Sequence, residues 1–175
     1  LDNKTDVLIN TGIKHLQSLG GTEKDKVFAW LCGLVSHIVA DVVIHPVVEL
    51  KVGPYHGNEK AHRICEMHQD AHIYQRMELG GIGLAEHLSA GIGKCSLDDD
   101  KDKMDLLIKE IWMEMLKAIR PDEFNDYVPN IDAWHEAFNK NVSVFEEGNK
   151  LHPIARHVAV NAGITYPDED NIDIQ

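Results

Sequence analysis

The sequence has little of what marks disulfide-stabilised, membrane-spanning or nucleic-acid-binding proteins. Its three cysteines, Cys32, Cys65 and Cys95, form no Cys-x-x-Cys pair, so we predict no disulfide framework, and the redox compartment stays open. Lysine and arginine together number 17 against 29 acidic residues, and the net charge of -12 at pH 7 argues against broad nucleic-acid binding, which needs a basic surface. No signal peptide is visible, and no uninterrupted apolar run reaches the ~18 residues of a membrane span.

Internal repeats and the apolar–polar alternation of β-strands are also lacking, whereas apolar residues recur at helical spacing through most of the chain. We therefore predict an all-α fold, a helical bundle, with one metal-binding domain over residues 1–166 and an acidic tail at 167–175. We expect this domain to lack an upstream segment, because the chain opens without methionine close to a helix start. Glycine and proline predict loops at 51–58 and 79–93. The predicted helices span residues 5–19, 23–44, 59–78, 98–119, 131–147 and 151–162.

Two of these helix boundaries depend on particular residues. Pro46 restricts His45 away from helical angles, so the second helix is expected to end there. Asp98, Asp99 and Asp100 are expected to start the fourth helix, where negative charge interacts favourably with the helix dipole. The run DDDKDKMD lacks the residue order and the glycine of an EF-hand calcium loop, so we interpret it as a solvated helix start.

The second predicted helix is apolar on most of its sides. A helix of this kind is typical of the buried centre of a protein. Burying an unpaired charge is costly, so His37 and Asp41 on this helix need a partner. A metal ion is the economical partner for both.

Histidines and carboxylates gather in the middle of the chain at a spacing that suits metal binding. Six of the eleven histidines lie between residues 37 and 72. Residues four apart on a helix lie on one face. Nitrogen and carboxylate oxygen donors without cysteine are a metal-site composition. Two successive sets follow this spacing: His37, Asp41 and His45, then His62, Glu66 and Asp70.

The rise of the helix separates two metal positions. At 1.5 Å per residue, His37 and His45 lie about 12 Å apart along the axis, too far to share one ion easily. The economical arrangement uses five ligands, with one zinc held by His45, His62 and Glu66 and a second by His37 and Asp41. The second position is short of ligands, and the Asp41 carboxylate is placed to bridge both ions. Asp70 is expected to hydrogen bond a ligand histidine. An internal salt-bridged network without metal is the alternative.

Two segments resemble a known family: GLVSHIVADVVIHP and, sixteen residues later, HRICEMHQD. They are similar to the metal-binding core of zinc-dependent phospholipases C and of the bacterial relatives of glycosylphosphatidylinositol-specific phospholipase D. The resemblance implies a helical bundle related to the single-strand-specific zinc nucleases, a cluster of two or three zinc ions, and a secreted or periplasmic location in a bacterium. It also implies that the zinc ligands are His37, Asp41, His45, His62 and Glu66.

The resemblance has two departures. The spacing from Asp41 to His45 is shorter than in the best-known phospholipases C, so His45 is expected to approach its ion differently. The family also draws an amino-terminal group, a histidine and an aspartate from upstream, and it places its base there. We expect these groups to lie outside this chain.

The function predicted from these features is that of an enzyme, a metal-dependent phosphodiester hydrolase. The resemblance and the acidic charge favour a phospholipase C-like activity on phospholipid head groups, with transient contact at a membrane surface, over action on nucleic acid. Glu66 or Asp70 would assist proton transfer. Two alternatives stay open, a nuclease-like zinc phosphodiesterase and a non-catalytic helical module with structural zinc.

Overall fold

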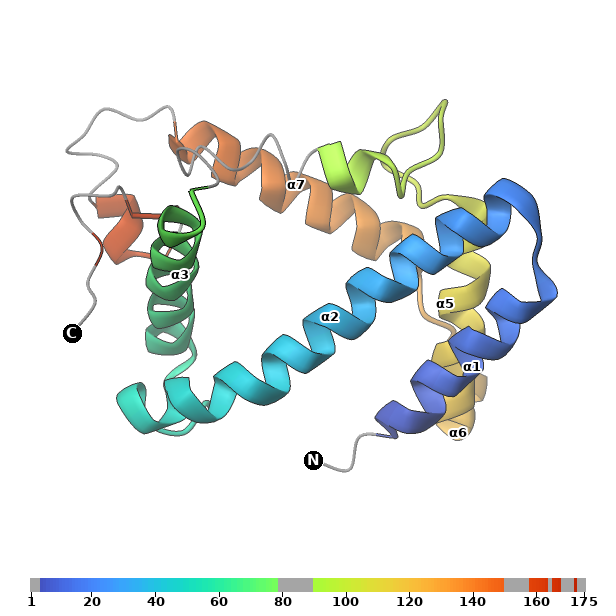
Figure 1. Ribbon diagram of the computed structural model, residues 1–175, viewed down its shortest axis with the longest axis horizontal. Helices are drawn as coiled ribbons and strands as arrows, with labels where there is room; N and C mark the ends of the chain where they lie inside the picture. The colour runs from blue at the N-terminus through green and yellow to red at the C-terminus, as the bar shows by residue number, and fades with distance from the viewer. Residues whose placement is uncertain (1–3, 79–89, 150–157, 164, 168–171, 173–175) are drawn as a thin grey trace. The chain divides into compact units, whose positions relative to one another are not determined.

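A computed structural model describes residues 4–78, 90–149, 158–163, 165–167 and 172 (Figure 1). Within these residues the chain is helical and forms no strand beyond an isolated bridge between Ser96 and Met104, so the predicted all-α class is confirmed. The helices are α1 (Thr5–Ser18), α2 (Gly21–Val52), α3 (Glu59–Arg76), α5 (Leu106–Ile119), α6 (Pro121–Asp126) and α7 (Ile131–Asn149).

Most helix boundaries lie within two residues of those predicted, but the end of α2 does not. The helix continues through Pro46 to Val52, so the prediction that it ends at His45 is wrong. A proline removes only one helical hydrogen bond, and the backbone pattern resumes after it, with the N–H of Gly53 donating to the carbonyl of Glu49 at 2.9 Å. Val48 is fully buried, and its packing stabilises the turns that follow the proline.

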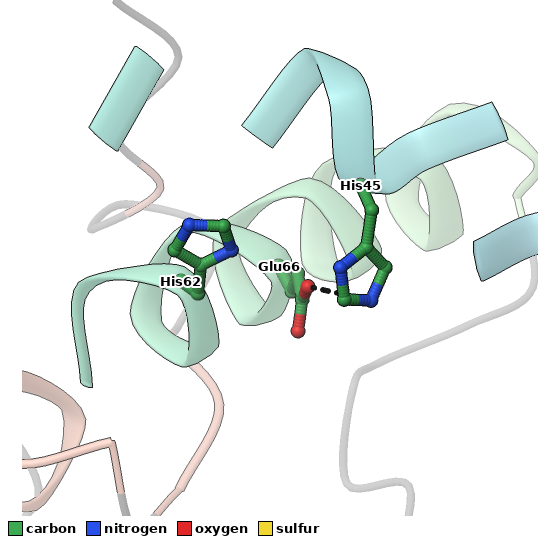
Figure 2. A group of neighbouring side chains, drawn as sticks. All are labelled: His45, His62 and Glu66. Carbon is green, nitrogen blue, oxygen red and sulfur yellow. Dashed lines mark ion pairs between the residues drawn. The ribbon is translucent and has the colours of Figure 1, made fainter. Parts of the chain in front are cut away.

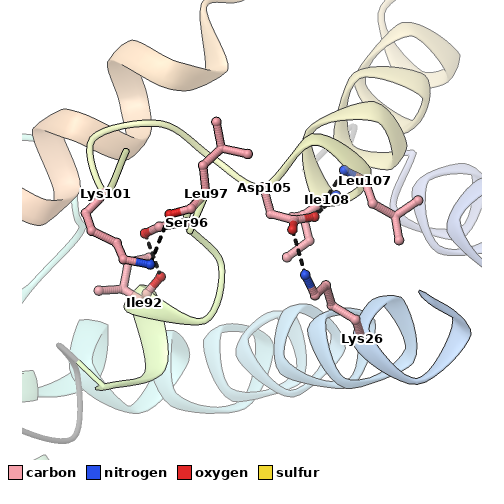
Figure 3. Close-up of polar contacts among 8 residues, drawn as sticks. All are labelled: Lys26, Ile92, Ser96, Leu97, Lys101, Asp105, Leu107 and Ile108. Atoms are coloured by element: carbon pink, nitrogen blue, oxygen red, sulfur yellow. Dashed lines mark hydrogen bonds and ion pairs between the residues drawn. The ribbon is translucent and has the colours of Figure 1, made fainter. Parts of the chain in front are cut away.

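The start of α5 also differs from the prediction. Asp98 and Asp99 precede α5 in a turn, closed by the N–H of Leu97 donating to the carbonyl of Lys103 at 3.0 Å. The helix is capped instead by Asp105, whose carboxylate accepts hydrogen bonds from the N–H groups of the second and third residues of the helix (Figure 3). A cap requires this specific geometry, and clustered negative charge does not supply it.

The remaining segments include one helix that was not predicted and three predictions that fall largely outside the described residues. The short helix α6 was not predicted, although Pro121 at its first position is a residue that such positions favour. The predicted loop at 79–93 and the predicted helix at 151–162 lie largely outside the described residues. Of these segments, residues 90–93 and 158–161 are helical. Most of the acidic tail also lies outside them.

The chain divides into two compact units. The first comprises Leu1–Ala40 and Ile92–Phe138, and the second Asp41–Gly91 and Asn139–Gln175. In the first unit α1 packs against α5 around a core of buried apolar side chains, formed by Val27, Leu31, Ile111 and Met115. The core of the second unit includes three buried residues of α3, namely Cys65, Met67 and Ala71.

The prediction that α2 is buried on most sides is wrong. Only its two fully buried valines and Leu31 reach below a tenth of exposure, whereas Val42 is 67% and Leu50 90% exposed. Averaged hydropathy also makes α2 long and apolar enough to cross a membrane, by length and composition alone, although no uninterrupted apolar run is that long. Core helices and signal sequences pass the same test, so it is weak evidence. Because α2 is largely exposed, burial cannot be the reason that His37 and Asp41 need a metal.

Candidate metal centre

Three predicted ligands from two helices meet in the second unit. His45 near the end of α2 and His62 and Glu66 on α3 place one donor atom each so that all lie within 4.8 Å of one another (Figure 2). The Nε2 of His45 lies 3.7 Å from Oε1 of Glu66. On α3 the two ligands are one helical turn apart and so face the same side. The side chains of His45 and Glu66 are 39% and 35% exposed, so the group opens to solvent.

The turn that precedes α3 selects the tautomer of a neutral His62 ring. Its Nε2 lies 2.7 Å from the carbonyl oxygen of Gly53, and because a carbonyl can only accept, Nε2 carries the proton. The neutral ring then has its lone pair on Nδ1. This atom is buried and has no hydrogen-bond partner among the residues that the structure describes. Histidines that bind metals characteristically donate their other N–H to a carbonyl or carboxylate in this way.

The turn between α2 and α3 is built from residues that allow its tight path. Gly53 and Gly57 hold φ angles of 92° and 88°, which residues other than glycine rarely adopt. The side chain of Asn58 donates to the carbonyl of Pro54 at 2.8 Å and closes the turn. Tyr55, between these residues, lies edge-on to His62 with 5.2 Å between ring centroids. The predicted loop at 51–58 therefore forms one wall of the site.

The remaining two predicted ligands are placed differently. Asp41 is the first residue of the second unit, and its Oδ1 lies 3.9 Å from Nε2 of His45. Its side chain is 50% exposed. His37 belongs to the first unit and is not a member of the three-residue group. The second metal position therefore stays a prediction.

Comparison with protein families identifies the chain. The sequence profile of zinc dependent phospholipase C matches residues 2–121, more than half of its length. The chain belongs to this family. The family is one of zinc-dependent hydrolases with all-α folds, and the matched segment includes all five predicted ligands. No curated protein and no solved structure matches the chain.

The zinc dependent phospholipase C profile does not reach Tyr166, a residue that the sequence did not point to. This tyrosine hydrogen bonds Asp70, which lies one helical turn beyond Glu66. Asp70 as a residue is exposed, but partial desolvation of its carboxyl group raises the pKa of that group, and the negative charge of Glu66 raises it further. Burial likewise raises the pKa of Tyr166. Ninety-six positions separate the two residues in the sequence, so no local spacing could have paired them.

The donor set suits zinc. Two imidazoles and one carboxylate are a ligand combination that catalytic zinc sites use, with a further coordination position left for water or substrate. Nδ1 of His62 is one of three buried histidine nitrogens without a hydrogen-bond partner among the described residues, with His15 Nε2 and His135 Nδ1. It points to a metal because two other donor groups lie within 4.8 Å of it, and a metal would offset the cost of burying it unpaired. His56 is fully exposed and pairs with Glu59 at 3.9 Å, consistent with a place outside the ligand group.

Proposed function

We propose that the protein hydrolyses the phosphodiester bond of phospholipid head groups, as a phospholipase C, at the group formed by His45, His62 and Glu66. The observation that carries this proposal is the convergence of the three donor atoms within 4.8 Å, where the buried Nδ1 of His62 has no other partner among the described residues. Membership of the zinc dependent phospholipase C family supplies the reaction class.

The residues of the chain would divide the work as follows. His45, His62 and Glu66 would hold one zinc ion, and Asp41 with His37 would contribute to a second. Zinc, when bound, polarises phosphoryl oxygens and makes water a stronger nucleophile near neutral pH.

Asp70 would take up or return a proton. Its raised pKa lets the carboxyl group keep a proton to higher pH than an ordinary aspartate does. The hydrogen bond with Tyr166 would hold this carboxyl group in place.

A catalytic role for the metal is better supported than a structural one. Structural zinc sites are closed by four protein ligands, whereas catalytic sites keep a position open. The group found in the described residues has three members, and two of them are partly exposed to solvent. Phospholipid is favoured over nucleic acid because the chain carries a net charge of -12. A secreted or periplasmic location and transient contact with a membrane surface remain predictions.

Zinc content and substrate cleavage, measured on the same preparations, test the proposal. We expect the chain to retain zinc after dialysis and to release phosphocholine from phosphatidylcholine vesicles. Glu66→Gln and His62→Asn each remove a ligand, so zinc content should fall well below one ion per chain and activity by at least about 100-fold. Glu110→Gln is the matched control, because Glu110 is an exposed carboxylate of α5 in the other unit.

Each alternative gives a different result. Stoichiometric zinc with no cleavage of any phosphodiester would make the metal structural, and chelation should then unfold the chain. Preferential cleavage of single-stranded DNA would assign a nuclease. A chain that binds no zinc would refute the proposal altogether.

A further inference from the structure

One aromatic side chain contacts both imidazoles of the metal group. The ring of Tyr55 lies 5.2 Å from that of His62 at an interplanar angle of 81°, and 6.2 Å from that of His45 at 47°. The two histidine rings are themselves 6.2 Å apart. The three rings therefore lie at the corners of a triangle, in which Tyr55 is the corner without a metal-binding nitrogen.

We propose that Tyr55 is a positioning residue, which holds His45 and His62 in their metal-binding orientations before the ion arrives. The inference rests on the proposed function to the extent that these histidines bind zinc. It adds a determinant of zinc affinity that contributes no ligand atom.

The backbone around Tyr55 is fixed by hydrogen bonds at short range. Its carbonyl accepts from the N–H of Asn58 at 3.0 Å, and the side chain of Asn58 also donates to the carbonyl of Pro54. Gly57 donates its N–H to Oε1 of Glu59 at 2.9 Å, which ties the turn to the start of α3. A side chain on a backbone held in this way has few orientations, so its ring can restrain its neighbours.

The ring contacts restrain the two histidines by different amounts. The edge-on contact with His62 matches the arrangement that aromatic pairs prefer, and Gly53 already fixes the other edge of this imidazole. Within the described part of the chain, the polar neighbours of His45 are the carboxylates of Asp41 and Glu66, at 3.9 and 3.7 Å, which is longer than a hydrogen bond. Loss of the Tyr55 ring should therefore affect His45 most, because its side chain is also partly exposed.

The hydroxyl group of Tyr55 plays no part in this argument. Tyr55 is 51% exposed, and the contacts that restrain the histidines come from its ring. Phenylalanine should therefore substitute for it, whereas an aliphatic side chain should not. This difference separates positioning by the ring from any role of the hydroxyl.

Zinc affinity of the metal-free chain, measured by competition with a chromophoric chelator, tests the inference. Tyr55→Leu should bind zinc about tenfold more weakly, because loss of groups that orient metal ligands typically costs 10–100-fold and the ligands themselves remain. Tyr55→Phe should stay within about twofold of the wild type. His56→Ala is the matched control in the same turn and should leave zinc affinity unchanged, because the His56 side chain is fully exposed.

The visible absorption of the Co(II)-substituted chain gives a readout that a general loss of stability would not change. Tyr55→Leu should alter the d–d bands, and Tyr55→Phe should restore them. If circular dichroism shows that the leucine variant has lost helix, Tyr55→Met, whose flexible side chain has similar reach, takes its place.

Unchanged zinc affinity and an unchanged Co(II) spectrum in the leucine variant would overturn the inference. Equal losses in Tyr55→Phe and Tyr55→Leu would also overturn it, because the hydroxyl would then be responsible. A wild-type chain that binds no zinc would instead refute the proposed function, so the two failures are distinguishable.

Discussion

Replacing Gly53 by alanine should weaken zinc binding, whereas the same replacement at Gly57 should not. The two glycines lie in one turn and hold nearly equal φ angles, 92° and 88°. An L side chain at such angles costs about 1–2 kcal/mol, so both variants should lose similar backbone stability. Gly57→Ala is therefore an internal control for strain.

The magnitude at Gly53 comes from two further contacts. A Cβ added at Gly53 would lie 3.2 Å from Nδ2 of Asn58, whereas no atom of the described residues lies within 4 Å of a Cβ at Gly57. Asn58 is tied to the carbonyl of Pro54, so the backbone of Gly53 must shift instead. Its carbonyl would then lose the hydrogen bond from Nε2 of the fully buried His62. A buried donor left without an acceptor costs about 1–3 kcal/mol, which the Gly57 variant would not lose.

Chelator competition and urea unfolding of the metal-free chain measure the two effects separately. We expect Gly53→Ala to bind zinc about 10–100-fold more weakly, because His62 can then rotate or carry its proton on Nδ1. Gly57→Ala should match the zinc affinity of the wild type while sharing the loss of stability. Equal zinc affinities in the two variants would show that the Gly53 carbonyl does not orient His62, and would refute the reasoning.

Two more predictions concern the first unit. Gly12→Ala should lower the free energy of unfolding by about 1 kcal/mol or more, because a Cβ there would lie 2.6 Å from Cδ2 of Leu31. Gly33→Ala should raise it by up to about 1 kcal/mol, because Gly33 lies on an exposed face of α2 with no described atom within 4 Å of a Cβ. Urea unfolding should give changes of opposite sign for the two variants, and changes of equal sign would contradict the packing argument. Asp105→Ala should lose about 1 kcal/mol of cap stability, and Asp99→Ala close to none. Although burial raises the pKa of Asp105, the hydrogen bond from Lys26 and those from the backbone lower it overall, so its contribution is present above the ordinary aspartate pKa of about 4 and is lost as the pH falls below it. The difference in unfolding free energy between the wild type and Asp105→Ala should therefore be smaller at pH 3 than at pH 7. An equal difference at both pH values would contradict this assignment.

Much of the fold follows from local sequence signals. Helical periodicity predicted the class and the extent of α1, α3 and α7, because each helix buries one face at a fixed spacing. Local signals failed where a single residue opposed its context. Pro46 predicted an end to α2, but the buried Val48 and the regular hydrogen bonds after it outweigh one missing N–H. The aspartates at 98–100 predicted the start of a helix, whereas α5 starts at Leu106, after the Asp105 cap.

The candidate site divides in the same way. Spacing four residues apart put His62 and Glu66 on one face of α3, and the same rule put Asp41 and His45 on one face of α2, so the sequence by itself determined which side chains each helix presents. It did not determine how exposed α2 would be, because that depends on what packs against the helix.

Only the tertiary structure decided what surrounds the ligands. The acceptor for Nε2 of His62 is a backbone carbonyl, which has no signature in the sequence. The ring of Tyr55 lies beside the two imidazoles because the turn after α2 folds back over them. Tyr166 meets Asp70 across ninety-six positions. Such contacts arise from chain reversal and side-chain packing, and these depend on the whole fold, whereas the ligand spacing depends only on the pitch of a helix.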